Sequence, residues 1–315
     1  MKNILVSIPA LNEEKSLAAV IEGIKSISIP RTKIGILVVD DGSTDDTAKI
    51  AKDHGVALIS HGTNRGLGSA FRSAVRYALS HRVDVMVTID GDGQFDPADI
   101  PRLAQPILEN TSDFVTASRF RNSELIPQMP RLKLWGNKRI AWLVNKLAGT
   151  QLHDVSCGYR AYSRESLLSL DLIGSYTYTH EVILTLAFRG LRIVEIDVSV
   201  RGEREHGRSR LAGSVVKYGL NAGIIILRNF RDYRPLTIFG IPAIFIGAAG
   251  ILSLCYFAIS SIILQEFTPK VLAFVGAFLL LFATLVFVTA LLADMFTRIR
   301  IQLEELKRQL SEKGE

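Results

Sequence analysis

Two long uncharged stretches near the C-terminus constrain the architecture of this chain most strongly. No charged residue occurs from Pro235 to Leu264 or from Val271 to Ala293, and the short segment 265–270 separates the two stretches. A helix crosses a bilayer with about 20 apolar residues, so each stretch is long enough to span one. Two buried core helices are the competing interpretation, which this length and purity disfavour. We therefore expect a two-helix transmembrane hairpin over residues 235–296.

Basic residues on both outer flanks of the hairpin predict its orientation. They are Arg228, Arg231 and Arg234 before the first stretch, and Arg298, Arg300, Lys307 and Arg308 after the second. By the positive-inside rule, both flanks face the cytoplasm. The formal charge of +6 fits a protein that contacts anionic membrane lipids, and no basic motif interleaved with aromatic residues indicates nucleic acid as a partner. We expect a multi-pass protein of the cell membrane whose N-terminal domain and both termini are cytoplasmic.

The segments that flank the hairpin mix apolar and charged residues. Residues 214–230 are typical of a helix that lies along a membrane surface, and Lys217 and Asn221 argue against a third span. In the tail, Ile299, Leu303, Leu306 and Leu310 recur near helical spacing. We expect interfacial amphipathic helices over 212–234 and a cytoplasmic C-terminal helix over 297–315. That last helix is either solvated or binds a partner, such as a second copy in a homo-oligomer.

Residues 1–211 alternate short apolar runs with helical patterns, which predicts an α/β fold. The apolar runs are 4–8, 34–39, 56–59, 83–89 and 114–117, and the helical patterns include 14–27, 44–53, 68–80 and 97–108. Because the first residues lead directly into a strand pattern, no signal peptide is expected. Strands and helices in alternation favour a mostly parallel sheet flanked by helices.

Polar clusters follow the predicted strands. They are Pro9-Ala-Leu-Asn-Glu13, Asp40-Asp-Gly-Ser-Thr-Asp-Asp-Thr47, Asn64-Arg-Gly-Leu-Gly68, Asp90-Gly-Asp-Gly-Gln94 and Ser118-Arg119. Any one of them fits a capped helix start, with Ser43 or Thr44 as the cap of the second. Ligands of such sheets bind beyond the carboxyl ends of the strands, so five clusters at one edge favour a ligand site. Neither the dinucleotide fingerprint nor the P-loop pattern occurs.

The segment from Asp90 to Gln94 has the composition of a partial metal site. Asp90, Asp92 and Gln94 stand at alternate positions just after an apolar strand. Oxygen ligands of this kind suit Mg²⁺ or Mn²⁺, and a site with few protein ligands usually shares its metal with a substrate phosphate. An ordinary surface turn made of Asp and Gly is the alternative interpretation.

Taken together, these motifs resemble glycosyltransferase family 2. The resemblance rests on the clusters above, on Asn64-Arg-Gly-Leu-Gly-Ser-Ala70, on Ser118-Arg-Phe120 and on Asp154-Val-Ser-Cys-Gly-Tyr-Arg160. It covers roughly the first 211 residues and is most specific for the dolichyl- and polyprenyl-phosphate sugar synthases. The resemblance implies a cytoplasmic GT-A domain over residues 1–211. It also implies transfer of a hexose from a nucleotide-diphosphate sugar, such as GDP-mannose or UDP-glucose, to a dolichyl or polyprenyl phosphate.

The resemblance also implies roles for individual residues in donor binding. The base and ribose would contact Pro9, Leu11, Asn12, Glu13, Val39 and Asp41, although Leu11 stands where the family often has Tyr. Asp90 and Gly91 would lie along the sugar and ribose. Asp92 and Gln94 would ligate the Mg²⁺ or Mn²⁺ ion that bridges the diphosphate.

Further residues match family positions near the phosphates and the reacting atoms. Arg119 and Arg204 match phosphate-binding positions, and Arg210 stands where relatives often carry Lys. We expect Asp92, Asp154 and Arg204 to be the catalytic residues. For Asp154 three roles stay open, namely a base, a group that positions the acceptor, and a cap of the turn that leads to Cys157. Glu181 would assist from the far side of the site, and His180 reads as a structural neighbour.

Two other functions share part of this pattern. A processive polysaccharide synthase would use the same nucleotide-binding motifs, but its Gln-x-x-Arg-Trp motif is missing and two spans are too few for a polymer channel. A catalytically inactive membrane scaffold is disfavoured because Asp90 and Asp92 are both present. We therefore expect an inverting glycosyltransferase, whose sugar and base the motifs do not specify.

Overall fold

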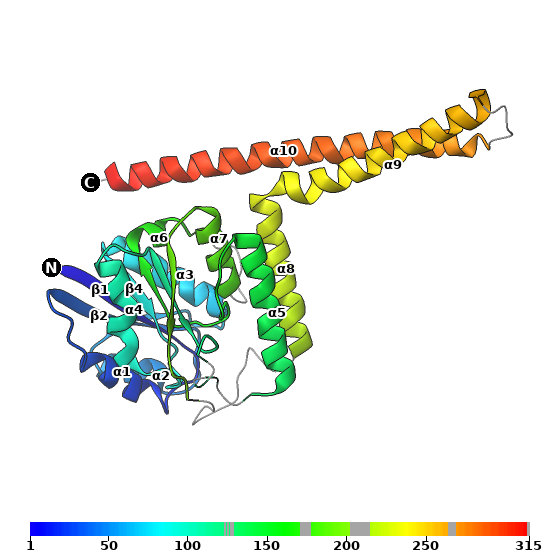
Figure 1. Ribbon diagram of the computed structural model, residues 1–315. Helices are drawn as coiled ribbons and strands as arrows, with labels where there is room; N and C mark the ends of the chain where they lie inside the picture. The colour runs from blue at the N-terminus through cyan, green and yellow to red at the C-terminus, as the bar shows by residue number, and fades with distance from the viewer. Residues whose placement is uncertain are drawn as a thin grey trace. The chain divides into compact units, whose positions relative to one another are not determined.

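The computed structural model describes residues 1–122, 124, 126, 129–170, 178–201, 215–263 and 269–313 of the chain. The chain divides into two compact units, Met1–Ile226 and Leu227–Glu315 (Figure 1). The first unit is built from strands and helices, and the second is helical among its described residues.

The first unit is organised around a seven-stranded sheet with the strand order β3-β2-β1-β4-β6-β5-β7. The strands are β1 (Lys2–Ala10), β2 (Thr32–Asp40), β3 (Ala57–Ser60), β4 (Val85–Thr88), β5 (Phe114–Ser118), β6 (Arg160–Ser163) and β7 (Ile193–Asp197). Strand β6 runs antiparallel to both of its neighbours, whereas the other pairs are parallel. The prediction of a mostly parallel sheet is therefore confirmed.

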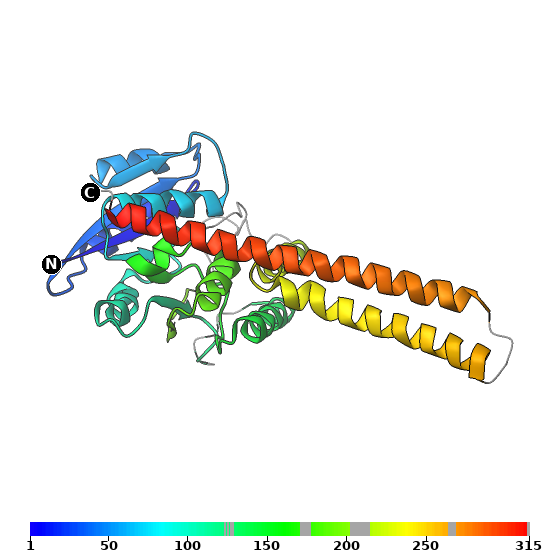
Figure 2. The same cartoon turned by 90° about the horizontal axis from the view of Figure 1, so that it is seen from above.

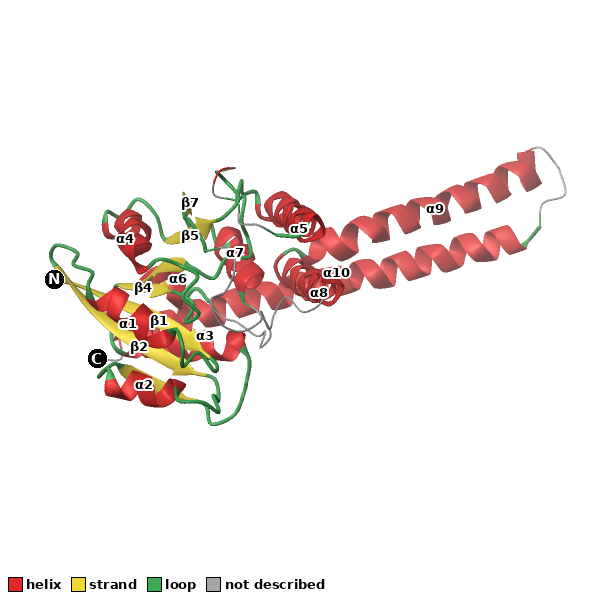
Figure 3. Cartoon of the chain, turned by 90° about the horizontal axis from the view of Figure 1, so that it is seen from below, coloured by secondary structure: helices red, strands yellow, loops and turns green. Residues whose placement is uncertain are grey.

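Helices cover both faces of this sheet because successive side chains of a strand point to opposite sides. In β1, Ile4, Val6 and Ile8 pack on one face and Leu5 packs on the other. The first face is covered by α1 (Leu17–Lys25), α2 (Thr47–Asp53) and α4 (Ile100–Leu108), the last preceded by a 3₁₀ turn, Pro97–Asp99. The second face is covered by α3 (Leu67–Ser80), α5 (Arg131–Ala148), α6 (Arg164–Leu168) and α7 (Thr179–Phe188) (Figure 3).

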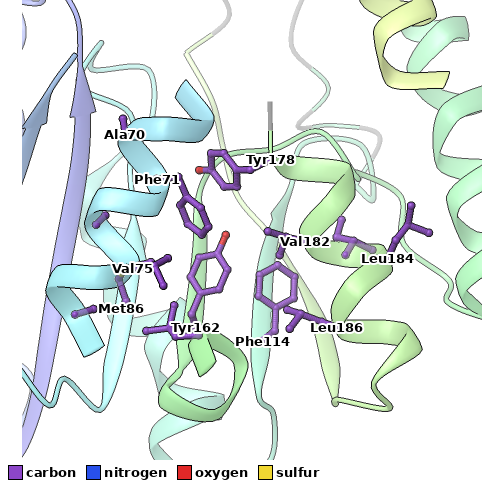
Figure 4. Close-up of a cluster of buried hydrophobic side chains, with 14 of the residues drawn as sticks. Ala70, Phe71, Val75, Met86, Phe114, Tyr162, Tyr178, Val182, Leu184 and Leu186 are labelled. Atoms are coloured by element: carbon purple, nitrogen blue, oxygen red, sulfur yellow. The ribbon is translucent and has the colours of Figure 1, made fainter. Parts of the chain in front are cut away.

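An aromatic cluster fills the core on the second face (Figure 4). The rings of Phe71 and Tyr178 stack with their centroids 3.9 Å apart, and Tyr162 lies tilted at 5.4 Å from Phe71 and 5.0 Å from Phe114. Such stacked and tilted pairs add to the stabilisation that comes from burial. The cluster joins α3, β5, β6 and the residue that precedes α7.

Two strands and the starts of two helices differ from the sequence prediction. Strands β6 and β7 were not predicted, because the buried Arg160 begins the first and the buried Glu195 interrupts the apolar pattern of the second. Helices α1 and α2 each begin three residues later than predicted, at Leu17 and Thr47. Neither Ser43 nor Thr44 caps α2; both instead form hydrogen bonds with the loop after β1, described below.

Two helices in the second unit are long and apolar enough to cross a membrane. Helices α8 (Val215–Tyr233), α9 (Ile241–Ala258) and α10 (Val271–Lys313) are the α-helices described after β7, and π-helical turns occur at Leu236–Gly240 and Ile259–Ile263. The candidate spans are Leu236–Ile262 and Val271–Leu303, which agree with the two predicted stretches. Helix α8 falls where a helix was predicted over 214–230.

Small residues hold α9 and α10 side by side (Figure 2). A Cβ on Gly276 would lie 2.8 Å from a side-chain carbon of Leu254 and 2.9 Å from the carbonyl oxygen of Gly250. The Ser253 hydroxyl donates to the Leu272 carbonyl at 2.9 Å. Close backbone approach at glycine is the usual way in which helices associate inside a bilayer.

The predicted C-terminal helix is a continuation of the second span. Helix α10 runs without interruption from Val271 to Lys313. Thr297 donates to the carbonyl oxygen of Asp232 at 3.0 Å, and the Arg300 guanidinium lies 5.9 Å from the ring of Tyr233. The start of the tail therefore packs against the end of α8, which is a contact within the second unit.

Gly42→Ala is expected to lower the free energy of unfolding more than Gly62→Ala. Both glycines have positive φ, 82° and 68°, where a residue with a Cβ costs about 1–2 kcal/mol. A Cβ at Gly42 would also lie 2.4 Å from the carbonyl carbon of Thr63, whereas nothing lies within 4 Å at Gly62. This clash should cost about 1–3 kcal/mol more. Urea unfolding in detergent would measure the difference, and equal losses would contradict the close contact of the two loops.

Candidate active site

The candidate site lies at the edge of the sheet where β1, β2, β4 and β5 end. Because β6 is antiparallel, it begins at this edge, with Arg160 in register with Thr88 and Thr116. The loop that precedes β6 is thereby brought to the ends of β4 and β5. The Thr88 hydroxyl donates to the Gly158 carbonyl at 2.7 Å, and a Cβ on Gly158 would lie 3.4 Å from an Asp90 carboxylate oxygen.

Hydrogen bonds join the loop after β1 to the loop after β2. The Asn12 amide N–H donates to the Ser43 hydroxyl at 2.9 Å, and the Asn12 Oδ1 atom accepts from the Thr44 N–H at 2.8 Å. The Glu13 N–H donates to the Thr47 hydroxyl at 2.8 Å. Asn12 has a φ of 50°, a left-handed conformation that Asn tolerates better than most residues. The Asn12 side chain thus orients the loop, and its direct contact with a nucleotide stays a prediction.

The Asp41 carboxylate also forms hydrogen bonds with a neighbouring loop. Its carboxylate is paired with the His61 ring at 2.8 Å and accepts from the N–H groups of Arg65 and Gly66 at 3.0 and 2.8 Å. Asp41 is 5% exposed and Val39 is fully buried. A nucleotide contact at Val39 would therefore have to come from its backbone. Pro9, Leu11 and Glu13, the other predicted contacts, are half-buried at the same edge.

The predicted metal-binding loop packs tightly against the end of β1. A Cβ on Gly91 would lie 3.3 Å from the Ile8 side chain, and the Gly91 carbonyl accepts from the Ser16 hydroxyl at 2.7 Å. Asp92 is 6% exposed, and its Oδ1 atom accepts from the Gln94 N–H at 3.0 Å. The Gln94 side-chain amide donates to the Arg201 carbonyl at 3.2 Å.

These residues fit a divalent cation as a partial ligand set. Asp92 offers a carboxylate and Gln94 an amide oxygen, which are the ligand types that Mg²⁺ and Mn²⁺ prefer. Among the residues that the structure describes, no three His, Cys, Asp or Glu side chains cluster closely enough to hold a metal. A cation at this loop would therefore need ligands in addition to Asp92 and Gln94.

Asp154 is a fully buried carboxylate that pairs with Arg119. The Arg119 Nε atom donates to Oδ2 at 2.6 Å and its Nη2 atom donates to Oδ1 at 3.0 Å. Oδ1 also accepts from the N–H groups of Ser156 and Cys157 at 3.0 and 3.1 Å, so Asp154 does cap the turn. Burial acts to raise the pKa of Asp154, but the charge and hydrogen bonds of Arg119 outweigh it and hold the pKa below its ordinary value.

A second carboxylate, Glu195 of β7, holds the same turn and was missed by sequence reasoning. Its Oε1 atom accepts from the N–H groups of His153 and Asp154 at 2.7 and 2.8 Å, and its Oε2 atom pairs with the His153 ring at 2.8 Å. The only signal in the sequence is a Glu within a short apolar run, Ile193–Asp197.

Three other polar residues near the Asp154 turn, Arg160, Cys157 and Glu181, are buried as well. Arg160 is fully buried and donates to the carbonyls of Thr179 and Val155 at 2.9 and 3.1 Å. Burial raises the pKa of the Cys157 thiol to about 12, so this thiol stays protonated. Glu181 is 6% exposed in the first turn of α7. Arg204 and Arg210, predicted near the phosphates, lie outside the described residues.

Comparison with known proteins finds a matching family model and similar relatives. The model for Glycosyl transferase family 2 matches residues 5–170, just over half of the 315 residues. An undecaprenyl-phosphate mannosyltransferase from Micrococcus luteus is 33% identical over 226 residues, which cover 68% of this chain and 89% of that protein. A UDP-N-acetylglucosamine–dolichyl-phosphate N-acetylglucosaminyltransferase from Methanococcus voltae is 32% identical over 183 residues, 53% of this chain and 71% of that protein.

A solved structure supports the fold. Glucosyl-3-phosphoglycerate synthase from Mycobacterium tuberculosis, in complex with Mn²⁺, uridine diphosphate and glucosyl-3-phosphoglycerate, is similar with a TM-score of 0.58 and 23% identity, over 72% of this chain and 80% of that chain. The fold is therefore GT-A-like. The family match and the named relatives identify the protein as a glycosyltransferase. The chain belongs to glycosyltransferase family 2, as its motifs predicted.

The stability of the protein is expected to fall as the pH drops from 6.5 towards 4 because of His180. Burial, and then the charge of Arg160, lower the pKa of His180 from 6.5 to about 4. Between pH 6.5 and pH 4, His180 binds a proton in the unfolded chain but stays neutral in the folded protein. The contribution of the neutral His180 to the free energy of unfolding is therefore complete above pH 6.5 and is lost as the pH falls towards 4. The loss reaches about 3 kcal/mol at the low end.

Thermal unfolding in detergent between pH 7 and 4 would measure this dependence. His180→Leu should flatten it, whereas His81→Leu, a change at an exposed histidine, should leave it in place. If the His180 variant kept the full dependence, another group would have to be responsible.

Proposed function

We propose that this glycosyltransferase transfers a hexose from a nucleotide-diphosphate sugar to dolichyl or polyprenyl phosphate. The hexose is mannose, glucose or N-acetylhexosamine, and the donor carries GDP or UDP. One observation carries the proposal: the Asp90–Gln94 loop and the Arg119–Asp154 pair meet at one sheet edge, in a chain that also has two helices of membrane-spanning length. The names of the two relatives, which include undecaprenyl phosphate and dolichyl phosphate, support this acceptor class.

The proposed donor site uses the loops after β1, β2 and β4. Pro9, Leu11, Asn12, Glu13 and the 39–41 segment would surround the base and ribose. Asp90 and Gly91 would lie along the sugar, while Asp92 and Gln94 would hold Mg²⁺ or Mn²⁺. A bound divalent cation neutralises charge that develops on the leaving nucleoside diphosphate. The Mn²⁺ and uridine diphosphate in the solved synthase of the same fold are consistent with this arrangement.

The state of Asp154 favours an acceptor that is already ionised. An aspartate with a lowered pKa, whose oxygens are occupied by Arg119 and two backbone N–H groups, is poorly suited to remove a proton. A phosphate monoester has a second pKa near 6 and needs no general base at neutral pH. In the proposed reaction, Asp154 is a positioning residue that holds Arg119 beside the substrate phosphates. Arg204 and Arg210, for which the resemblance implies roles near the phosphates, would add positive charge.

We further propose that the chain is anchored in the cell membrane by residues 235–296, with the catalytic domain over 1–211 and both termini in the cytoplasm. The interfacial helix over 212–234 and the tail over 297–315 would flank this anchor. The flanking arginines support this orientation. The donor would then reach the site from the cytoplasm, and the lipid phosphate from the adjacent leaflet.

A donor screen tests the function directly. The full-length protein in detergent would be given UDP- or GDP-linked glucose, mannose and N-acetylglucosamine, together with polyprenyl phosphate and Mg²⁺ or Mn²⁺. A lipid-linked sugar phosphate from at least one donor is the expected product. Formation of a sugar polymer without a lipid-phosphate product would instead indicate a polysaccharide synthase, and absence of any transfer would indicate a scaffold.

Asp92→Asn is expected to reduce transfer to the background rate while leaving the fold intact. The change removes the negative charge that would bind the cation and hardly alters the side-chain volume. Asp53→Asn is a matched control, because Asp53 is an exposed residue at the end of α2. Transfer rates should be measured over a titration of Mg²⁺ or Mn²⁺. Near-normal turnover of the Asp92 variant, or unchanged wild-type activity in excess chelator, would refute the role of this residue.

The product is expected to have the opposite anomeric configuration to the donor. If the acceptor phosphate attacks the anomeric carbon opposite the leaving diphosphate, a single displacement inverts that centre. An α-linked donor should therefore yield a β-linked lipid phosphate sugar. The anomeric coupling constants in NMR spectra of the product would establish the configuration, and retention would rule out the single displacement.

A further inference from the structure

One face of helix α5 exposes large apolar side chains in an otherwise well-packed domain. Leu132, Trp135 and Trp142 are 61%, 58% and 57% exposed. Their spacings of three and seven residues place them on one side of an α-helix. The chain contains only two tryptophans, and both stand on this face. We call Leu132, Trp135, Arg139, Trp142 and Lys146 the α5 outer face.

Basic side chains cover the two tryptophans in a repeated arrangement. The Arg139 guanidinium lies 5.4 Å from the Trp135 ring, and the Lys146 ammonium lies 5.2 Å from the Trp142 ring. In each pair the cation follows the tryptophan by four residues, and the second pair repeats the first after seven. Every charged residue in α5 is basic, namely Arg131, Lys133, Lys138, Arg139 and Lys146.

The side chains of the α5 outer face are not part of the hydrophobic core of the domain. Helix α5 packs on the rest of the domain through Ala141 and Val144, which are 5% and 0% exposed, with Ile140, Leu143 and Leu147 partly buried beside them. The tryptophans therefore contribute little burial to the fold. Exposed apolar residues gathered on one face mark an interaction site more often than scattered ones do.

We propose that the α5 outer face binds the headgroup region of an anionic bilayer. Tryptophan prefers the boundary between headgroups and acyl chains, where its ring is buried and its N–H stays hydrated. Arginine and lysine beside it complement anionic lipid headgroups, and this combination is typical of helices that lie in a membrane interface. The same chain has two helices that are long and apolar enough to cross a membrane, and the proposed membrane anchor would bring the domain to a bilayer.

The charge of the face disfavours a second copy of the chain as the occupant. A two-fold interface brings the same patch of both subunits together. In such an interface, Arg139 and Lys146 of one copy would face the same cations of the other copy. Helix α5 has no acidic residue that could compensate this repulsion. An anionic lipid surface meets the same side chains with opposite charge.

The two tryptophans provide a direct test in the full-length protein. The protein would be reconstituted into nanodiscs of phosphatidylcholine, with or without phosphatidylglycerol, and its intrinsic fluorescence recorded. Acyl chains brominated near the carbonyl should quench the emission, more strongly with phosphatidylglycerol, and aqueous iodide should quench it poorly. Trp135→Phe and Trp142→Phe would assign the effect to each ring. Efficient quenching by iodide without quenching by bromolipid would overturn the proposal, as would protection from both quenchers, which would indicate a protein partner.

Charge reversal provides the matched comparison. Arg139→Glu combined with Lys146→Glu should abolish the dependence of bromolipid quenching on phosphatidylglycerol. Lys49→Glu combined with Lys52→Glu changes the charge equally on the exposed side of α2 and should preserve the dependence. Each variant is compared with itself in unbrominated discs, so altered tryptophan brightness cancels. An unchanged dependence in the α5 variant would contradict the proposal. The readout requires no sugar transfer, so its outcome is separate from that of the proposed function.

Discussion

The arrangement of the candidate active site depends on the buried carboxylate of Asp154. A charge in a protein interior is costly unless it is paired and hydrogen-bonded. Asp154 meets this requirement with the Arg119 guanidinium and two backbone N–H groups of its own turn. Glu195 holds the Asp154 N–H in turn. These contacts leave the segment between Asp154 and Gly158 little freedom, and Gly158 then lies against Asp90.

The reversed direction of β6 makes this convergence possible. Had β6 been parallel to β4 and β5, its start would lie at the opposite edge of the sheet, far from the ends of those strands. Its antiparallel pairing instead brings the Asp154 turn to the edge where the other polar loops gather. The Tyr162 ring of β6 packs against Phe71 of α3, and the buried Arg160 of β6 donates a hydrogen bond to the Thr179 carbonyl at the start of α7.

Local patterns in the sequence were sufficient for part of this arrangement. The runs at Ile4–Ile8 and Ile34–Val39 predicted β1 and β2 because their apolar residues are continuous, and the loop at Asp90–Gln94 stood out by composition. The partners of Arg119 and Asp154 could not be read in this way, because 35 residues separate them. Glu195 and the His153–Asp154 turn it holds are similarly distant in sequence. Sequence motifs identified the residues, whereas the ion pairs that orient them depend on the order of strands in the sheet.

The position of Glu195 in the chain has a consequence for biosynthesis. Strand β1 pairs with β2 on one side and β4 on the other, and all three strands are complete once residue 88 has been made. The hydrogen bonds from the Asp154 turn to Glu195 can form only when β7 has emerged from the ribosome. The first apolar span begins at Leu236, shortly after that strand. Chains emerge N-terminal end first during translation, so the nascent domain completes the candidate site edge before the two helices of membrane-spanning length have been made.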